Sequence, residues 1–391
     1  MKIILNYKQY IKKEKGAIST LVLFTVLLFA AILMGSYLVV TGLQKSQLKS
    51  DIRIQDIYLK QINNIDEIYE QKLASSIETL RDSGIYVSKE TIVKDAKGNQ
   101  IIIPKGFKIA EDSGLTVDEG IVIEDKDIKT GIGNDKGNQY VWVPVGEVTK
   151  KDGTTTNIKL GRYTFESDGK ATIVQKASEY LEDKVISNYY RELADKGSIT
   201  KIGKIALNLK NFLDSAQANK GYYIARYEAS YGEDGKANFK VSNGYSESTA
   251  PTTEGTLWNY ITEINSAKAC REMYDTITSD LANSYAWDTA IFFIQECSDD
   301  PDYSKKSSAN KTIANTGEIK DEVCKINDMA SNNFEWTTEY STEAINNTYA
   351  LPSVYRGGCY KFAARYPDSR YSDYTTCNNW YTGFRAILYI E

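Results

Sequence analysis

A run of 28 residues without a single charge, Ala17 to Gln44, constrains this chain more than any other feature. As a helix it would be roughly 42 Å long, more than the ~30 Å hydrocarbon core of a bilayer. Five lysines against one glutamate precede it, so the positive-inside rule places residues 1–16 in the cytoplasm. We therefore predict a basic leader at 1–16, a transmembrane helix at 17–44, and a single-pass membrane protein whose C-terminal domain is extracellular. A cleaved secretory signal is the alternative.

The junction Lys15-Gly16, directly before the apolar run, resembles that of type IV pilins and pseudopilins, where a prepilin peptidase cuts after the glycine. The resemblance implies cleavage after Gly16. The family usually has methionine or an aromatic residue first and a glutamate fifth in the mature chain, whereas this chain has Ala17 and Leu21. The missing carboxylate argues against normal assembly into a pilus.

Apolar residues continue at helical spacing to Leu80. They predict a helical stalk at 45–85, whose apolar stripe packs either on the chain's own domain or on a partner helix. Short β-branched runs between turn residues follow and predict a small β segment at 86–135. Similar strings at 97–106 and 136–146 each lead from Gly-Asn-Gln into a strand that ends at a proline.

The most specific strings lie near the C-terminus: DMASNNFEWT at 328–337, YRGGC at 355–359 and GFR at 383–385. They resemble the formylglycine-generating-enzyme (sulfatase-modifying factor) family, whose pattern runs D-M-x-G-N-x-W-E-W-T, R-G-G-S and G-F-R. Weaker matches lie upstream, at 222–228 and 286–290. The resemblance implies an α+β domain over 136–391 with the C-type-lectin-like fold, short strands, two helices and much irregular backbone.

In this family the D-M-x-G-N-x-W-E-W loop commonly holds calcium. By position, the ligands implied here are Asp328, the carbonyls of Ser331 and Asn333, and the side chain of Glu335. Oxygen donors within eight residues suit a hard cation. A loop held by hydrogen bonds alone is the alternative.

The chain lacks the chemistry of the family's enzymes, which use two cysteines shortly after R-G-G-S. Here Cys359 takes the place of the serine, and the next cysteine, Cys377, lies 18 positions on. The sequence contains no histidine, which excludes Ser-His-Asp and Cys-His mechanisms and imidazole general bases. We therefore predict that the protein is not an enzyme. Its five cysteines leave at least one thiol unpaired, and a Cys359–Cys377 disulfide is one open possibility.

The segment between Gly358 and Gly383 is rich in tyrosine, serine, asparagine and aspartate, a composition typical of antibody-type binding surfaces. It also resembles the variable proteins of diversity-generating retroelements, which place their variable positions between the R-G-G motif and the final G-F-R strand. Burial of about half of the aromatic residues in the core is the simpler alternative. The predicted ligand-binding residues are Tyr360, Tyr366, Asp368, Ser369, Tyr371, Ser372, Asp373, Tyr374, Asn378, Asn379 and Trp380.

These features favour a surface-displayed, membrane-tethered, receptor-like protein that binds an extracellular protein or glycan ligand. Nucleic acid is not expected as a partner, because the net charge is −5 and phosphate binding requires a clustered basic surface. A pseudopilin or minor pilin is the structural alternative, and a formylglycine-generating oxidoreductase is the enzymatic one.

Overall fold

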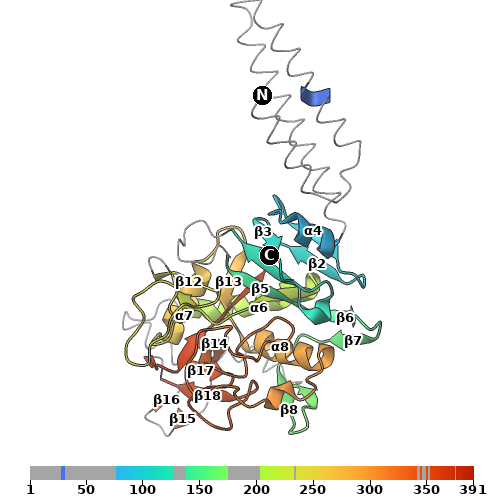
Figure 1. Ribbon diagram of the computed structural model, residues 1–391. Coiled ribbons are helices and arrows are strands. Elements are labelled where there is room, and N and C mark those ends of the chain that lie inside the picture. Colours follow the sequence, from blue (N-terminus) through green and yellow to red (C-terminus); the bar gives the residue numbers. More distant parts are fainter. Residues whose placement is uncertain are drawn as a thin grey trace, which may run out of the picture. The chain divides into compact units, whose positions relative to one another are not determined.

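The computed structural model describes residues 28–30, 76–126, 137–174, 203–232, 235–340, 344–345, 349–350, 353–374 and 376–391. The chain divides into two units, Met1–Tyr69 and Glu70–Glu391, and the account below concerns the second. Its described part is a mixed α+β domain with few helices and many short strands, as the sequence predicts (Figure 1).

A six-stranded antiparallel sheet forms the centre of this domain, in the order β13-β20-β10-β5-β4-β3. Because side chains alternate along a strand, neighbouring tyrosines of β10 point to opposite faces. Tyr222 donates to the carbonyl of Ala286 in helix α8 and packs on Phe212 of helix α6. Tyr223 donates to the carbonyl of Ile102 in the β1–β2 hairpin. The sheet therefore lies between α6 and α8 on one face and this hairpin on the other. Its strands are β3 (Phe107–Ile109), β4 (Val122–Asp125), β5 (Gln139–Pro144), β10 (Gly221–Ala225), β13 (Thr278–Leu281) and β20 (Ala386–Tyr389).

A second, four-stranded sheet has the order β18-β17-β14-β19 and carries most of the C-terminal motifs. β14 runs antiparallel to β17 and parallel to β19. The strands are β14 (Phe334–Tyr340), β17 (Ser353–Arg356), β18 (Arg370–Asp373) and β19 (Thr382–Phe384). The motif residues Glu335, Arg356 and Gly383 thus lie side by side, since Glu335 pairs with both of the others.

The described helices are short and end at recognisable caps. Ser76 accepts from the N–H of Thr79 at the start of α4, and Gly84 closes that helix at a φ of 62°. Thr262 caps α7 and Asn283 caps α8 in the same way. The helices are α4 (Ile77–Ser83), α6 (Gly203–Ala218), α7 (Glu263–Arg271) and α8 (Ser284–Cys297), with short 3₁₀ turns η1 (Val117–Glu119) and η4 (Tyr303–Lys305).

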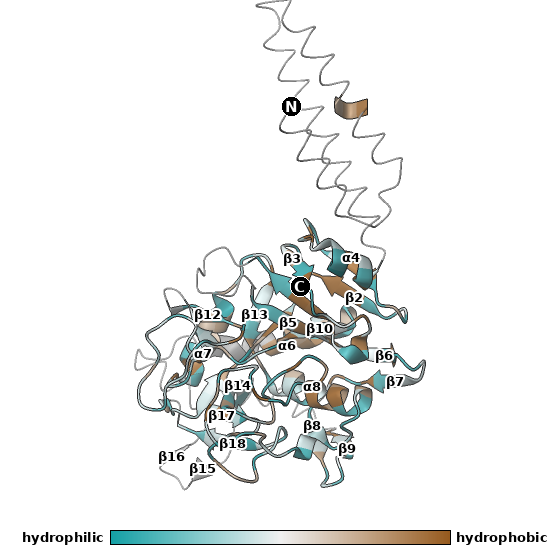
Figure 2. Ribbon diagram, in the orientation of Figure 1, coloured by the Kyte–Doolittle hydropathy of each residue, from teal (hydrophilic) through white to brown (hydrophobic). Residues whose placement is uncertain are grey.

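Among the described residues, five two-stranded hairpins complete the architecture, and Figure 2 shows that β7 is mostly hydrophilic whereas β2 is mostly hydrophobic. The hairpins are β1 (Thr91–Lys94) with β2 (Gln100–Ile103), β6 (Gly146–Thr149) with β7 (Thr155–Ile158), β8 (Tyr163–Phe165) with β9 (Ala171–Ile173), β11 (Ser230–Tyr231) with β12 (Ala237–Asn238), and β15 (Ala344–Ile345) with β16 (Tyr349–Ala350).

The two similar Gly-Asn-Gln strings share one hydrogen-bond pattern at their asparagines. Asp95 accepts from the N–H and side-chain amide of Asn99, and Asp125 accepts from the N–H and side-chain amide of Asn138. Since β3 and β4 pair into one sheet with β5, the boundary drawn at 135/136 from the sequence runs through a continuous sheet. The described part of the segment at 86–135, residues 86–126, therefore contributes strands β3 and β4 to the central sheet of the domain.

The predicted location of the protein needs correction. Among the described residues, no helix is both long enough and apolar enough to cross a membrane. The longest of them, α6, has 16 residues and carries exposed charges at Lys210 and Asp214. This contradicts the prediction of a single-pass membrane protein with a cytoplasmic N-terminus. Of the predicted span at 17–44 only 28–30 is described, and the leader at 1–16 and the stalk at 45–75 lie outside the described residues.

Candidate functional site

An aromatic cluster occupies the second sheet and the predicted binding segment. Its centre is Phe334, which is 2% exposed. The ring centroids of Tyr355, Tyr371 and Phe362 lie 4.8, 5.7 and 6.0 Å from that of Phe334. A chain of edge-on contacts extends the cluster through Tyr381 to Trp380 and Tyr360. We call these seven residues, Phe334, Tyr355, Tyr360, Phe362, Tyr371, Trp380 and Tyr381, the aromatic face.

Two cations lie over rings of the aromatic face. Nζ of Lys361 is 4.9 Å from the ring centroid of Trp380, and the guanidinium carbon of Arg365 is 4.2 Å from that of Tyr371. At such exposed positions each contact contributes roughly 0.5–1 kcal/mol. Phe362 nevertheless remains 37% exposed, and Tyr374, directly after β18, is 48% exposed. Large aromatic groups thus reach solvent at two places, Phe362 in the loop between β17 and β18 and Tyr374 at the other end of β18.

The structure brings only some of the predicted binding residues to this surface. Tyr360, Tyr371 and Trp380 belong to the aromatic face, although Tyr360 is only 7% exposed. Asp373 accepts from Sγ of Cys377 at 3.1 Å and from the amide of Asn379 at 3.3 Å, which fixes the turn that presents the exposed Tyr374 and Asn378.

Other predicted residues form contacts within the protein instead. Asp368 forms an ion pair with Lys305, and the hydroxyl of Ser369 accepts from the N–H of Tyr366 at 2.9 Å. Tyr366 and Ser372 are half-buried. Sequence reasoning missed Phe334, Tyr355 and Phe362 as parts of the surface. Phe362 lies within the predicted segment. Its position as an apolar residue among polar ones could have indicated that it belongs to the surface.

A buried ion-pair network holds the base of the predicted segment. Arg356 donates to Asp288 at 2.5 Å, to Glu339 at 3.1 Å and to the carbonyl of Ser369 at 2.9 Å. Arg370 bridges the same two carboxylates, and Arg162 reaches Glu339. Burial alone would raise the pKa of Glu339, but the charges of the three arginines lower it to about 2. The network fixes the base of the predicted segment.

Four buried carboxyl groups lie in or against the predicted calcium loop: Asp328 and Glu335 belong to it, and Glu228 and Asp321 contact it. Glu228 accepts from the N–H of Asn333 at 2.8 Å, and Asp321 accepts from the N–H of Asp328 at 3.0 Å and from the hydroxyl of Ser331. Burial and neighbouring carboxylates raise the pKa of Glu228 well above its ordinary range and that of Asp328 to about 8. The surroundings therefore favour the neutral, protonated form of both groups.

The predicted calcium ligands fit a cation only in part. Both oxygens of Glu335 accept from Arg385, so this predicted ligand is already occupied. The hydroxyl of Ser331 donates to Asp321, but the predicted ligand there is the backbone carbonyl. Oδ1 of Asp328 and the amide oxygen of Asn333 are buried without a hydrogen-bond partner. Across the described ranges, no three acidic or cysteine side chains are grouped so as to hold a metal ion.

All five cysteines are free thiols in the structure. Cys359 is fully buried beneath the aromatic face, and burial raises its pKa to about 11. Cys377 is half-buried, and burial together with Asp373 raises its pKa to about 12. Neither thiol is activated as a nucleophile at neutral pH, because the thiolate is the reactive form.

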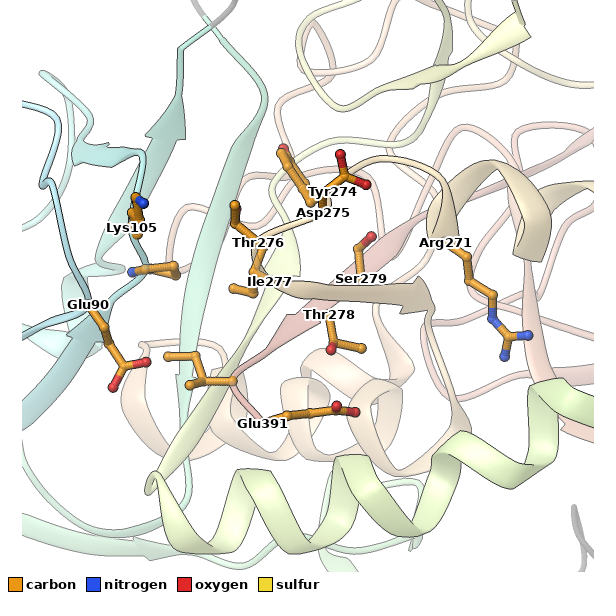
Figure 3. A pocket seen from close by; sticks show the side chains of 12 residues that line it. Glu90, Lys105, Arg271, Tyr274, Asp275, Thr276, Ile277, Thr278, Ser279 and Glu391 are labelled. Carbon is orange, nitrogen blue, oxygen red and sulfur yellow. The ribbon is translucent and has the colours of Figure 1, made fainter.

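Two cavities lie outside the aromatic face. One, of about 470 Å³, lies beside edge strand β13, with Glu90, Lys105, Thr278 and Glu391 around it (Figure 3). Its lining includes none of the predicted site residues. The other, of about 340 Å³, lies between helix α7 and the loop before it, and its lining includes the predicted residue Asn378.

Comparisons with known proteins place the chain in no family. No protein-family model matches it, and no curated protein is significantly similar to it. Among solved structures, the crystal structure titled "Crystal Structure of CarF" is similar to 44% of this chain and 88% of its own, at 14% identity and a TM-score of 0.33. A likeness this low carries no information about fold or function.

Proposed function

We propose that this protein is a ligand-binding protein without catalytic activity, whose C-type-lectin-like domain presents the aromatic face to a protein or glycan. One observation carries the proposal: the aromatic face is continuous from a buried centre at Phe334 to exposed groups at Phe362. Rigid aromatic residues that reach solvent beside adaptable polar groups are typical of binding surfaces.

The rigid setting of this surface supports the same proposal. The ion-pair network of Arg356, Asp288 and Glu339 is buried and ties the segment before β18 to helix α8. Trp287 in α8 adds a hydrogen bond from its indole N–H to the carbonyl of Pro367 at 2.8 Å. A surface fixed in advance loses little conformational freedom on binding.

The absence of catalysis is supported by the two thiols nearest the family's active-site position. Cys359 is enclosed, and the pKa of each thiol is raised, so neither resembles a thiolate that holds copper. Turnover of a Cys-x-Pro-x-Arg peptide in the presence of copper would contradict this part of the proposal.

Binding to an array of glycans and proteins tests the proposal, with Phe362→Ala and Tyr374→Ala as the site variants. Both side chains are exposed, so the variants keep the fold, and each should weaken binding at least fivefold. Ile92→Ala is the matched control, because Ile92 is 58% exposed on β1. Unchanged binding in Phe362→Ala would remove the aromatic face as the binding surface, and unchanged binding in Tyr374→Ala would remove the turn after β18.

Calcium in the 328–335 loop remains a separate proposal that rests on the family resemblance. Asp328 and Asn333 would hold the ion through their unpartnered oxygens, and Glu335 would not, because Arg385 occupies it. Calcium chloride should raise the melting temperature relative to EDTA, since a ligand that binds only the folded state stabilises it. The same shift in Asp328→Asn would exclude this loop as its source.

A further inference from the structure

The lining of the cavity of about 340 Å³ beside helix α7 includes a tyrosine with a strained backbone. Tyr260 has a φ of 53°, in the left-handed region that bulky side chains rarely adopt. Its N–H donates to the carbonyl of Asn379 at 3.0 Å, and its hydroxyl donates to the carbonyl of Glu247 at 2.7 Å. Strain of this kind persists where the surroundings fix it, and it is concentrated at functional sites.

This cavity lies next to the aromatic face. Asn259, next to Tyr260, donates from its amide to the carbonyl of Trp380 at 2.6 Å. Asn378, two residues before Trp380, lines the cavity. The cavity and the aromatic face are therefore neighbours along the segment from Asn378 to Trp380.

The walls of the cavity have two kinds of surface. Trp258 and Tyr260 are half-exposed and provide aromatic rings, and Trp258 is held edge-on against Phe384 with 5.4 Å between centroids. The lining also contains Asn265 and Asn378, exposed amides that both donate and accept hydrogen bonds.

The charged groups in the lining balance each other. They are Lys268 and Glu272, one turn apart on α7, with 4.0 Å between Nζ and Oε1. The cavity therefore offers no net charge to a ligand. A lining of aromatic rings and amides without net charge suits a ligand ring that has apolar C–H faces and hydroxyl groups at its edges.

We propose that this cavity binds one residue of a neutral glycan, with the pyranose ring against Trp258 and Tyr260 and its hydroxyls bound by Asn265 and Asn378. The proposal rests on the binding function proposed above and names the class of ligand for it. The volume of about 340 Å³ lies at the lower end of the range for ligand pockets, as a single sugar residue requires.

The test measures binding of the full chain to an array of neutral oligosaccharides, sialylated and uronic-acid oligosaccharides, and proteins. The best-bound neutral oligosaccharide is then titrated by calorimetry against the parent protein and the variants Asn265→Trp and Asn378→Trp. Both positions are exposed, so an indole fills the cavity from either wall without entering the core. Each variant should bind at least tenfold more weakly, while Lys170→Trp, exposed on the β8–β9 hairpin, should bind like the parent.

Parent-like affinity in both tryptophan variants, or an array in which only charged glycans or proteins bind, would overturn the proposal. The binding function itself would survive either result if Phe362→Ala and Tyr374→Ala still weakened binding. Binding that neither pair of variants changes would overturn both. Equal melting temperatures of parent and variants verify that the fold is kept.

Discussion

Arg385 and Glu335 form a two-pronged ion pair in which neither side chain is exposed: Nη2 lies 2.5 Å from Oε1, and Nε lies 2.6 Å from Oε2. Arg385 also donates to the carbonyls of Ala225 and Asn327, at 3.0 and 2.8 Å. The pair thus joins the end of the chain to β10, to β14 and to the loop before Asp328. It also explains why Glu335 is a structural residue rather than a calcium ligand.

Removing one partner of this pair should destabilise the protein strongly. Arg385→Ala leaves the Glu335 carboxylate buried without compensation, at a cost of about 3–5 kcal/mol in the free energy of unfolding. Urea denaturation measures the loss. Arg81→Ala is the control, since Arg81 pairs with the exposed Asp82 and should change stability by less than about 1 kcal/mol. Similar losses in the two variants would contradict the structural role of Arg385.

Acid should destabilise the domain through Glu339, whose pKa is lowered to about 2 from an ordinary value of 4.5. Because the folded state holds this carboxylate ionised, its contribution of about 3 kcal/mol is complete above pH 4.5. It is lost as the pH falls from 4.5 towards 2. Unfolding free energies at pH 6 and pH 3 measure the effect, and the difference between them should be smaller in Glu339→Gln. An equal difference would place the acid sensitivity elsewhere.

Gly358 should tolerate no side chain. A Cβ there would lie 1.7 Å from the carbonyl oxygen of Ala330, which is backbone and cannot move aside cheaply. Gly358→Ala should cost at least about 1–3 kcal/mol, as overpacked sites do. In Gly244→Ala the nearest atom would be Oγ1 of Thr256 at 3.7 Å, an ordinary contact, so stability should stay within about 1 kcal/mol. Thermal unfolding of both variants decides the point.

Thiol labelling should distinguish Cys377 from the other cysteines. It is half-buried, whereas Cys270, Cys297, Cys324 and Cys359 are buried. An aromatic disulfide reagent at pH 7 should modify one thiol slowly in the folded protein and five after denaturation, and Cys377→Ser should abolish the first phase. If only three thiols were labelled in the denatured, unreduced protein, two cysteines would be joined in a disulfide.

Local features were predictable where the cause acts over a few residues. The turn strings at 97–106 and 136–146 predicted strands that the structure contains as β2 and β5. The string at 286–290 lies in the first turns of α8, and an asparagine cap at 283 fixes that start. The mixed α+β class follows from the same signals. The sequence did not predict that the β segment and the main domain share one sheet. The order of turns along the chain does not reveal which strands pair with each other.

The sequence by itself determined the strands and turns, the absence of histidine, and a tyrosine-rich segment near the C-terminus, since these depend on residue type and short-range hydrogen bonding. Only the tertiary structure decided which of those tyrosines form a surface, because Phe334 and Phe362 come together from separate segments. It also decided that Glu335 binds Arg385, 50 residues away in the chain. The pair forms because both side chains are buried together, and that burial depends on every element packed around them.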